Sequence, residues 1–137
     1  MKKFIFASSL LLCSTAFCMN NAEIAKKACT DAYSHREIEK EKFQKLCNST
    51  VQAELNNNVE LDEAFQVSCE TMAATSLSSA YFCYSEASKA LKDVYPYKIV
   101  NENCSINYEK SANTHRLIDG YGCFSRNFDY VLQHENQ

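Results

Sequence analysis

Turn-forming residues are scarce in this sequence of 137 residues, which contains two glycines, one proline and no tryptophan. β-Sandwiches and β-barrels need turn residues at most of their strand connections. The scarcity argues against a fold of many short strands and favours helices. No apolar stretch is long enough to cross a bilayer as a helix, so we expect no transmembrane segment.

Several motifs that carry chemistry are also missing. The sequence has no Cys-x-x-Cys, no His-x-x-x-His, no Gly-x-Ser-x-Gly and no glycine-rich phosphate or dinucleotide loop. Thioredoxin-like exchange, zinc ribbons, serine hydrolysis and nucleotide binding each depend on one of these patterns. The sequence therefore predicts no catalytic residue, no metal site and no cofactor, and favours a protein that is not an enzyme.

The first 18 residues have the organisation of a signal peptide. Lys2 and Lys3 precede a short apolar run from Phe4 to Leu12, and small residues follow. Cleavage after Ala16 or after Cys18 fits the small-x-small rule, and cleavage after Cys18 leaves an even number of cysteines. We expect residues 1–18 to be removed and residues 19–137 to form a single secreted or periplasmic domain.

The charge balance is acidic. Lys and Arg number 14 against 17 Asp and Glu, which gives −3; loss of the two leader lysines leaves 12 against 17, or −5. An acidic chain is a poor candidate for binding nucleic acid or an anionic membrane surface. We therefore expect the partner to be a protein or a small ligand.

Six of the eight cysteines lie behind the leader at nearly even intervals. In an exported chain this even number predicts disulfide bonds. Alternate cysteines are 35–40 residues apart, the length of a helical-hairpin repeat. The simplest pairing joins the two cysteines of each hairpin, although fifteen connectivities are open. The favoured pairs are Cys29–Cys47, Cys69–Cys83 and Cys104–Cys123.

Apolar residues recur at helical spacing in six segments, nearly every one of which places a cysteine on its apolar face. The first spans about residues 21–33. A capping box, Ser34-His35-Arg36-Glu37, opens the second, whose core stripe begins at Ile38 and ends near Leu55. The third begins near Val59 and ends before the serine-rich stretch 75–79.

The remaining three segments follow from the same spacing. The fourth carries Ala80 to Leu91 behind an N-cap at Ser78 or Ser79, and the fifth carries Ile99 to Tyr108. The sixth begins at Thr114, or at about residue 122 if the two glycines delay it. The predicted fold is all-α, an array or bundle of about six helices arranged as three disulfide-linked α-hairpins.

The segment Ala28-Cys29-Thr30-Asp31-Ala32, with a second cysteine one helix later, resembles secreted bacterial repeat proteins built from cysteine-paired α-hairpins. That group is similar to the tetratricopeptide repeats in unit length. The resemblance implies stacked hairpins with a disulfide within each of them. A non-repeating bundle with evenly spaced cysteines remains the alternative.

Candidate functional residues are few. Tyr81, Tyr84, Tyr95 and Tyr97 cluster around the fourth segment, and tyrosine is enriched in recognition surfaces. Packing of these rings on a helix face is the other interpretation. Two further candidates are weaker still: His115 with Asp119, and the carboxylates Glu37 and Glu41, which are spaced one helical turn apart. His35 and His134 are expected at the surface.

The sequence thus predicts an exported helical module that binds a protein or a small ligand. The alternative is a small secreted hydrolase whose acidic catalytic residues the sequence does not identify. Carboxylates that converge in a cleft would favour the hydrolase, whereas a tyrosine-rich face would favour binding.

Overall fold

The computed structural model describes residues 19–94, 102–105 and 114–134, and this part of the chain contains no strand. The prediction of an all-α fold is confirmed. Five α-helices and one short 3-10 turn, η1, make up the structure: α2 (Asn21–Ala32), α3 (Lys40–Asn56), α4 (Leu61–Thr75), α5 (Leu77–Val94), η1 (Glu102–Cys104) and α6 (Thr114–His134).

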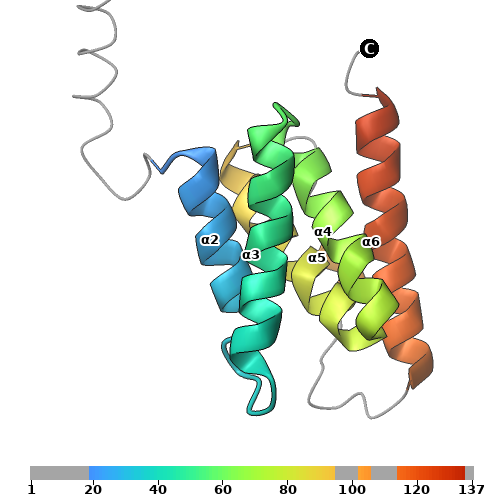
Figure 1. Cartoon of the computed structure of the whole chain (residues 1–137). Helices are drawn as coiled ribbons and strands as arrows, with labels where there is room; N and C mark the ends of the chain where they lie inside the picture. Colours follow the sequence, from blue (N-terminus) through green and yellow to red (C-terminus); the bar gives the residue numbers. More distant parts are fainter. Residues whose placement is uncertain (1–18, 95–101, 106–113, 135–137) are drawn as a thin grey trace, which may run out of the picture.

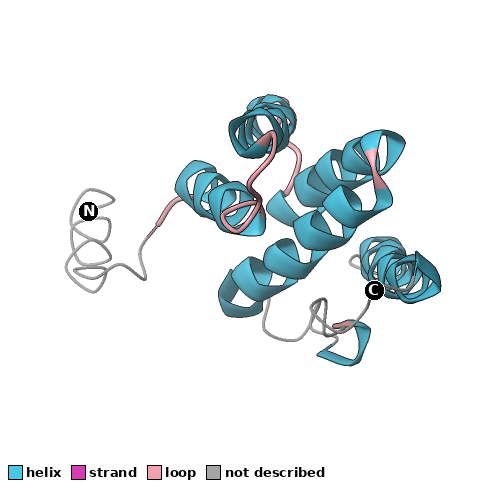
Figure 2. Cartoon of the chain, turned by 90° about the horizontal axis from the view of Figure 1, so that it is seen from below, coloured by secondary structure: helices cyan, strands magenta, loops and turns pink. Residues whose placement is uncertain are grey.

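The first four of these helices form a closed antiparallel bundle. Helix α2 packs against α3 and α5, and α4 packs against α3 and α5, so that each helix has two neighbours (Figure 1). Helix α6 packs outside this ring, against α4 and α5 and on the far side from α2 (Figure 2). Because α2 packs directly against α5, the first two hairpins close into a bundle.

Three disulfides each tie one helix to a segment packed against it. They join Cys29 to Cys47, Cys69 to Cys83 and Cys104 to Cys123, with Cα–Cα distances of 5.6, 5.3 and 5.4 Å. These are the three pairs that the spacing favours. The first two link α2 to α3 and α4 to α5, and the third links η1 to α6. Each closes a loop of 14–19 residues, for which the chain-entropy account gives about 3 kcal/mol of stabilisation.

A single extended residue, Ser76, separates α4 from α5, as the serine-rich stretch suggested. Its backbone N–H donates to the Met72 carbonyl and ends α4, while its Oγ accepts the Ser79 N–H at 3.1 Å and caps α5. The cap is therefore two or three residues earlier than the predicted Ser78 or Ser79. The hydroxyl can take this position because Ser76 has the extended backbone usual for an N-cap.

The predicted capping box at residues 34–37 does not form. Helix α3 begins only at Lys40, behind Glu39 in the left-handed region at φ 56°. The Ser34 hydroxyl instead donates to the Asp31 carbonyl at the end of α2. Ile38, predicted in the core, is 75% exposed because it lies in the loop that precedes α3.

Arg36 explains the path of this loop. Its Nη1 donates to Ser79 Oγ at 2.9 Å, and its guanidinium lies 4.3 Å from the centre of the Phe43 ring. The same Phe43 ring stacks on Tyr33, whose hydroxyl donates to the Ser79 carbonyl at 2.9 Å. These tertiary contacts bind residues 33–36 to the start of α5 and prevent them from beginning α3.

The fold has five α-helices in the described residues, not the predicted six. The fifth predicted helix, Ile99 to Tyr108, lies partly outside those residues, and its described part is the turn η1 around Cys104. Asn101 precedes this turn in the sequence and Asn103 lies within it, and asparagine favours turns over helix interiors. The sixth predicted helix is confirmed as α6, which begins at Thr114 and continues through both glycines.

Gly120 allows α6 to approach α5 closely. A Cβ at this position would lie 2.9 Å from Tyr81 Cε2 and 3.4 Å from the Cys104 carbonyl oxygen. The Tyr81 ring is buried and packs against Phe124, so it has little freedom to move away. At Gly122 an added Cβ would meet only the end of the exposed Arg126 side chain, at 3.0 Å.

The two glycines provide a matched test of this packing. In Gly120→Ala, overpacking costs about 1–3 kcal/mol and outweighs a gain of about 1 kcal/mol in helix propensity. We expect Gly120→Ala to destabilise the protein and Gly122→Ala to stabilise it slightly, as measured by urea unfolding of the oxidised protein. A shift in the same direction for both variants would contradict this packing of α6 on α5.

Candidate functional site

A groove of about 800 Å³ runs between the antiparallel helices α2 and α5. Apolar side chains from both helices form its floor, and charged side chains stand along its rim. Met19 and Val94 lie at one end because the start of α2 is next to the end of α5. The lining residues are Met19, Asn21, Ile24, Lys27, Ala28, Asp31, Glu86, Lys89, Ala90 and Val94.

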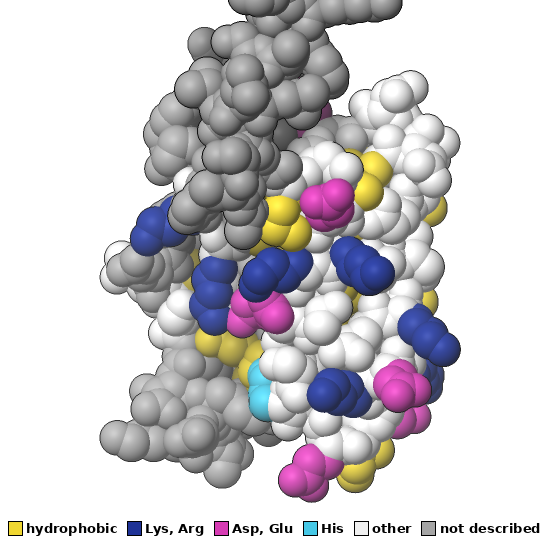
Figure 3. All heavy atoms as spheres, turned by 90° about the vertical axis from the view of Figure 1, so that its left-hand side faces the viewer, with side chains coloured by type: hydrophobic (Ala, Val, Ile, Leu, Met, Phe, Trp, Pro, Cys, Tyr) yellow, Lys and Arg dark blue, Asp and Glu magenta, His cyan; other side chains and the backbone are white. Residues whose placement is uncertain are grey.

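Each helix contributes one ion pair to the rim. On α2, Lys27 Nζ lies 2.5 Å from the Asp31 carboxylate; on α5, Lys89 Nζ lies 2.7 Å from Glu86. The hydrogen bond to Asp31 raises the pKa of Lys27, and the charge of Glu86 across the groove adds to this effect. The rim therefore offers two cations and two carboxylates. Figure 3 shows lysine and acidic side chains beside exposed apolar surface on this face of the molecule.

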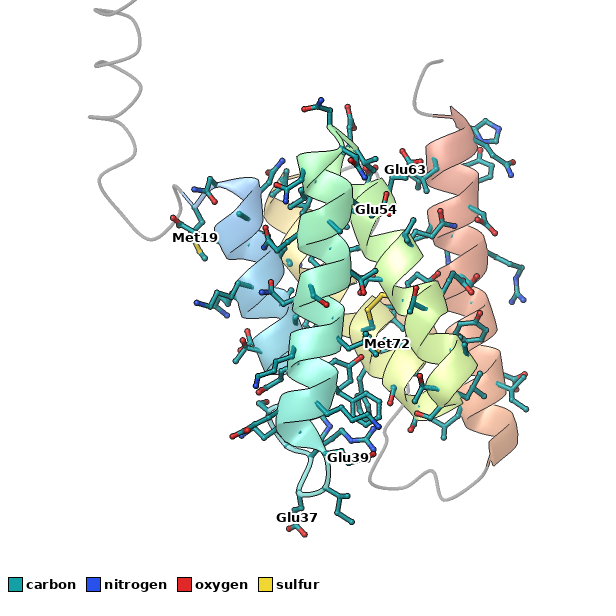
Figure 4. The ribbon with its side chains drawn as sticks, viewed as in Figure 1. Met19, Glu37, Glu39, Glu54, Glu63 and Met72 are labelled. Atoms are coloured by element: carbon teal, nitrogen blue, oxygen red, sulfur yellow. A yellow bond between two sulfur atoms is a disulfide. The ribbon has the colours of Figure 1, made fainter. Side chains whose placement is uncertain are left out.

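A second, shallower hollow of about 300 Å³ lies at the other end of α2, where the loop before α3 meets the start of α5. His35 stands edge-on to the Phe82 ring, with 4.6 Å between ring centres. Glu37 projects from the loop away from the bundle, whereas Met72 points in among the helices (Figure 4). This hollow is smaller and more open than the groove.

Two of the four tyrosines predicted to form a recognition surface, Tyr81 and Tyr84, do not lie at the surface. Tyr81 is 3% exposed and Tyr84 is fully buried, so both rings belong to the core. Their aromatic neighbours Phe124 and Phe128 on α6 account for this burial. The observation favours the second interpretation, packing on a helix face. Tyr95 and Tyr97 lie outside the described residues.

The Tyr84 hydroxyl takes part in a polar junction of three helices. It donates to Glu70 Oε1 of α4 at 2.5 Å. From α6, Tyr121 donates to Glu70 Oε2 at 2.6 Å and Ser125 donates to Oε1 at 2.8 Å. One carboxylate thus accepts three hydroxyl hydrogen bonds and joins α4, α5 and α6.

The three donors determine the acid–base state of this junction. Partial burial alone would raise the pKa of Glu70, but the hydrogen bonds from Tyr121, Tyr84 and Ser125 outweigh it and lower that pKa. Desolvation, reinforced by the neighbouring Glu70, raises the pKa of Tyr121 to about 12 and that of Tyr84 further. The tyrosines are therefore neutral hydrogen-bond donors at ordinary pH, and their hydrogen bonds to Glu70 join the three helices.

Sequence reasoning missed Glu70, although a signal was present. Glu70 follows Cys69 and Tyr84 follows Cys83, so the Cys69–Cys83 disulfide brings the carboxylate and the hydroxyl together. The groove had a weaker signal: Lys27–Asp31 and Glu86–Lys89 have the spacing of intrahelical ion pairs. Neither pattern reveals by itself which helix faces α2.

Of the weaker candidates, the carboxylate pair does not form. Glu37 lies in the loop before α3, so Glu37 and Glu41 are not one turn apart on a helix. His134 is exposed and stacks on Tyr130, and His35 is exposed as expected. Asp119 is also exposed on α6, whereas the side chain of His115 is not among those described.

The described ranges contain neither a cluster of metal-ligating residues nor a membrane-spanning helix. No group of three or more His, Cys, Asp or Glu residues there is arranged to hold a metal ion. No helix among the described residues combines the length and the apolar character needed to cross a membrane. No family model, no curated protein and no solved structure matches this chain.

The low pKa of Glu70 makes stability depend on pH. A carboxyl whose pKa is lower in the folded state stabilises the fold above its ordinary value of 4.5, and this contribution disappears as pH falls through the folded value. In Glu70→Gln, the amide cannot accept all three hydroxyls, and an unsatisfied group costs about 1–3 kcal/mol. We expect this variant to be less stable at pH 7 and to lose less stability than the parent between pH 5 and pH 3.

Urea unfolding across this pH range measures the difference. Glu54→Gln is the control, because Glu54 lies on α3, is partly exposed and takes no part in the junction. If the parent and Glu70→Gln had parallel pH profiles, the junction would not be the source of the pH dependence.

Proposed function

We propose that this chain is an exported, disulfide-stabilised module that binds a partner protein in the groove between α2 and α5. The occupant we infer is an amphipathic helix of the partner, with a narrow apolar stripe flanked by charges of both signs. The observation that carries the proposal is the groove itself, which is of ligand-binding size and combines an apolar floor with a charged rim.

The floor suits a helix because its central residues are small. Ala28 and Ala90 contribute only methyl groups, while Ile24 and Val94 provide larger apolar contacts toward one end. The distance between packed helices depends on the side chains at their contact, so alanines allow an incoming helix to approach closely. Helix-in-groove recognition uses apolar anchors spaced by three or four residues, which matches a groove between two antiparallel helices.

The rim supports a partner with charges of both signs. The side chains of Lys27 and Lys89 are largely exposed, whereas those of their partners Asp31 and Glu86 are partly exposed. Exposed ion pairs contribute about 0–1 kcal/mol, so exchanging them for charges on a partner costs little. Two cations and two carboxylates would be satisfied best by a partner that presents both signs.

Helix α6 shows that a pair of helices in this bundle can accept a further helix in the cleft between them. Helix α6 lies outside the four-helix ring in the cleft between α4 and α5, where Phe124 and Phe128 are buried. The groove between α2 and α5 is the corresponding cleft on the other side of α5. We infer that the partner's helix binds there much as α6 binds to its own pair.

The hydrolase alternative draws less support from the groove. Its two carboxylates, Asp31 and Glu86, each have a lysine of the same helix within 2.7 Å as an ion-pair partner, so their surroundings are alike. General acid–base catalysis by a carboxyl pair needs environments that drive their pKa values apart. Binding is therefore the better proposal. The disulfides suit the oxidising compartment that the predicted leader implies.

The proposal is tested by nuclear magnetic resonance with designed peptides. Labelled oxidised protein is titrated with a peptide that carries a Leu/Ala stripe flanked by Lys and Glu, and with a scrambled peptide of the same composition. We expect shifts on the groove faces of α2 and α5 with the first peptide and much weaker shifts with the second. Decanoate is the third probe, as a small amphiphile.

Ala90→Arg should abolish the shifts because it fills the floor. Ala53→Arg, on the exposed face of α3, is the matched control and should leave them unchanged. Thermal melts of both variants check that they fold. Binding of decanoate but not of the helical peptide would overturn the choice of occupant, and no response in the groove to any probe would overturn the proposed function.

A further inference from the structure

The three disulfides differ in their surroundings, and one of them is arranged for thiol exchange. We propose that Cys104–Cys123 is a thiol-exchange site at which the thiolate of a small thiol or dithiol attacks Cys123 Sγ and Cys104 is the leaving group. The inference rests on burial and on one side-chain amide, and it is independent of the groove between α2 and α5.

Access distinguishes this bridge from the other two. Cys29, Cys47, Cys69 and Cys83 are each at most 2% exposed, so no thiolate can approach their sulfurs without opening of the bundle. Cys104 is equally buried, but Cys123 is partly exposed on α6. Among the three bridges, only this one therefore joins a partly exposed cysteine to a buried one, and we infer that the sulfur of the partly exposed residue is the one attacked.

Asn127 determines which sulfur leaves. One of its amide protons donates to the Cys123 carbonyl, with 2.8 Å between Nδ2 and oxygen, and this bond directs the nitrogen toward the bridge. The same Nδ2 lies 3.3 Å from Cys104 Sγ and 3.7 Å from Cys123 Sγ. The second proton is therefore closer to the Cys104 sulfur, where it stabilises the negative charge that develops on a leaving thiolate.

A thiolate attacks Cys123 Sγ and forms a mixed disulfide; the bond between the two cysteine sulfurs breaks, and Cys104 leaves with its electron pair as a thiolate. With a dithiol, the second thiolate attacks the reagent's own sulfur in the mixed disulfide and displaces Cys123 as a thiolate. The dithiol becomes a cyclic disulfide, and the protein gains two electrons and, on protonation, two protons.

Two measurements test the site in the native protein. In the first, the oxidised protein is treated with dithiothreitol without denaturant, quenched with N-ethylmaleimide at intervals and mapped by mass spectrometry. We expect Cys104 and Cys123 to be alkylated well before the other four cysteines. In the second, reduced glutathione replaces dithiothreitol, and the mixed disulfide should form on Cys123 and not on Cys104.

Asn127→Ala and Asn127→Asp test the role of the amide. Both remove the donor to the leaving sulfur, and we expect reduction of this bridge to slow about tenfold, which corresponds to 1.36 kcal/mol of transition-state stabilisation. Asn48→Ala is the matched control, since Asn48 is a partly buried asparagine next to Cys47 and accepts a hydrogen bond from Gln52. It should leave the rate for Cys104–Cys123 unchanged.

Three results would each overturn a different part of the proposal. Simultaneous reduction of all three bridges, or earlier reduction of another one, would overturn the site. A glutathione adduct on Cys104 would overturn the direction of attack. Unchanged rates in both Asn127 variants, with folding checked by circular dichroism, would overturn the assignment of the amide.

Discussion

The structure depends on the constraint that each disulfide places on the faces of two adjacent segments. A bridge between Cα atoms 5.3–5.6 Å apart leaves little freedom in how two helices meet. Cys29–Cys47 therefore fixes which face α2 turns toward α3, and Cys69–Cys83 fixes the faces of α4 and α5. With these faces set, the alanines of α2 and α5 lie together at their contact, and the groove forms above them. The polar junction at Glu70 follows from the same constraint.

Much of the fold could be predicted from the sequence because it depends on local patterns. Apolar spacing locates α2, α4 and α5, where Phe65, Met72 and Leu91 are buried as their spacing requires. The cysteine pairing that the even intervals favour, among fifteen possible connectivities, is the one observed. The errors lie where a tertiary contact overrides a local signal. Ser34 has the right spacing for a cap, but Arg36 is bound to Ser79 and Phe43, and the segment becomes a loop. The two glycines of α6 suggested a later start for this helix. The reason for Gly120, its close contact with the Tyr81 ring, involves a residue that is distant in sequence.

The candidate site could be predicted least. A groove between α2 and α5 requires that the first and last helices of the four-helix ring meet, and no spacing along the chain specifies that contact. Tyrosine enrichment pointed instead to Tyr81 and Tyr84, which are buried because α6 covers them with Phe124 and Phe128. The same composition fits a surface cluster or a core, and only the position of α6 decides between them.

The two proposals divide the molecule along α5. Its contact with α2 carries the groove, while α6, packed on its other side, carries the exchangeable bridge. The bridges within the four-helix ring are buried, so exchange at Cys123 leaves α2, α3, α4 and α5 covalently intact. Helix α6 also keeps its hydrogen bonds to Glu70 when the bridge opens, because they come from Tyr121 and Ser125 and not from the sulfurs. Loss of the bridge should therefore loosen η1 before it loosens α6, and it should leave the groove unchanged.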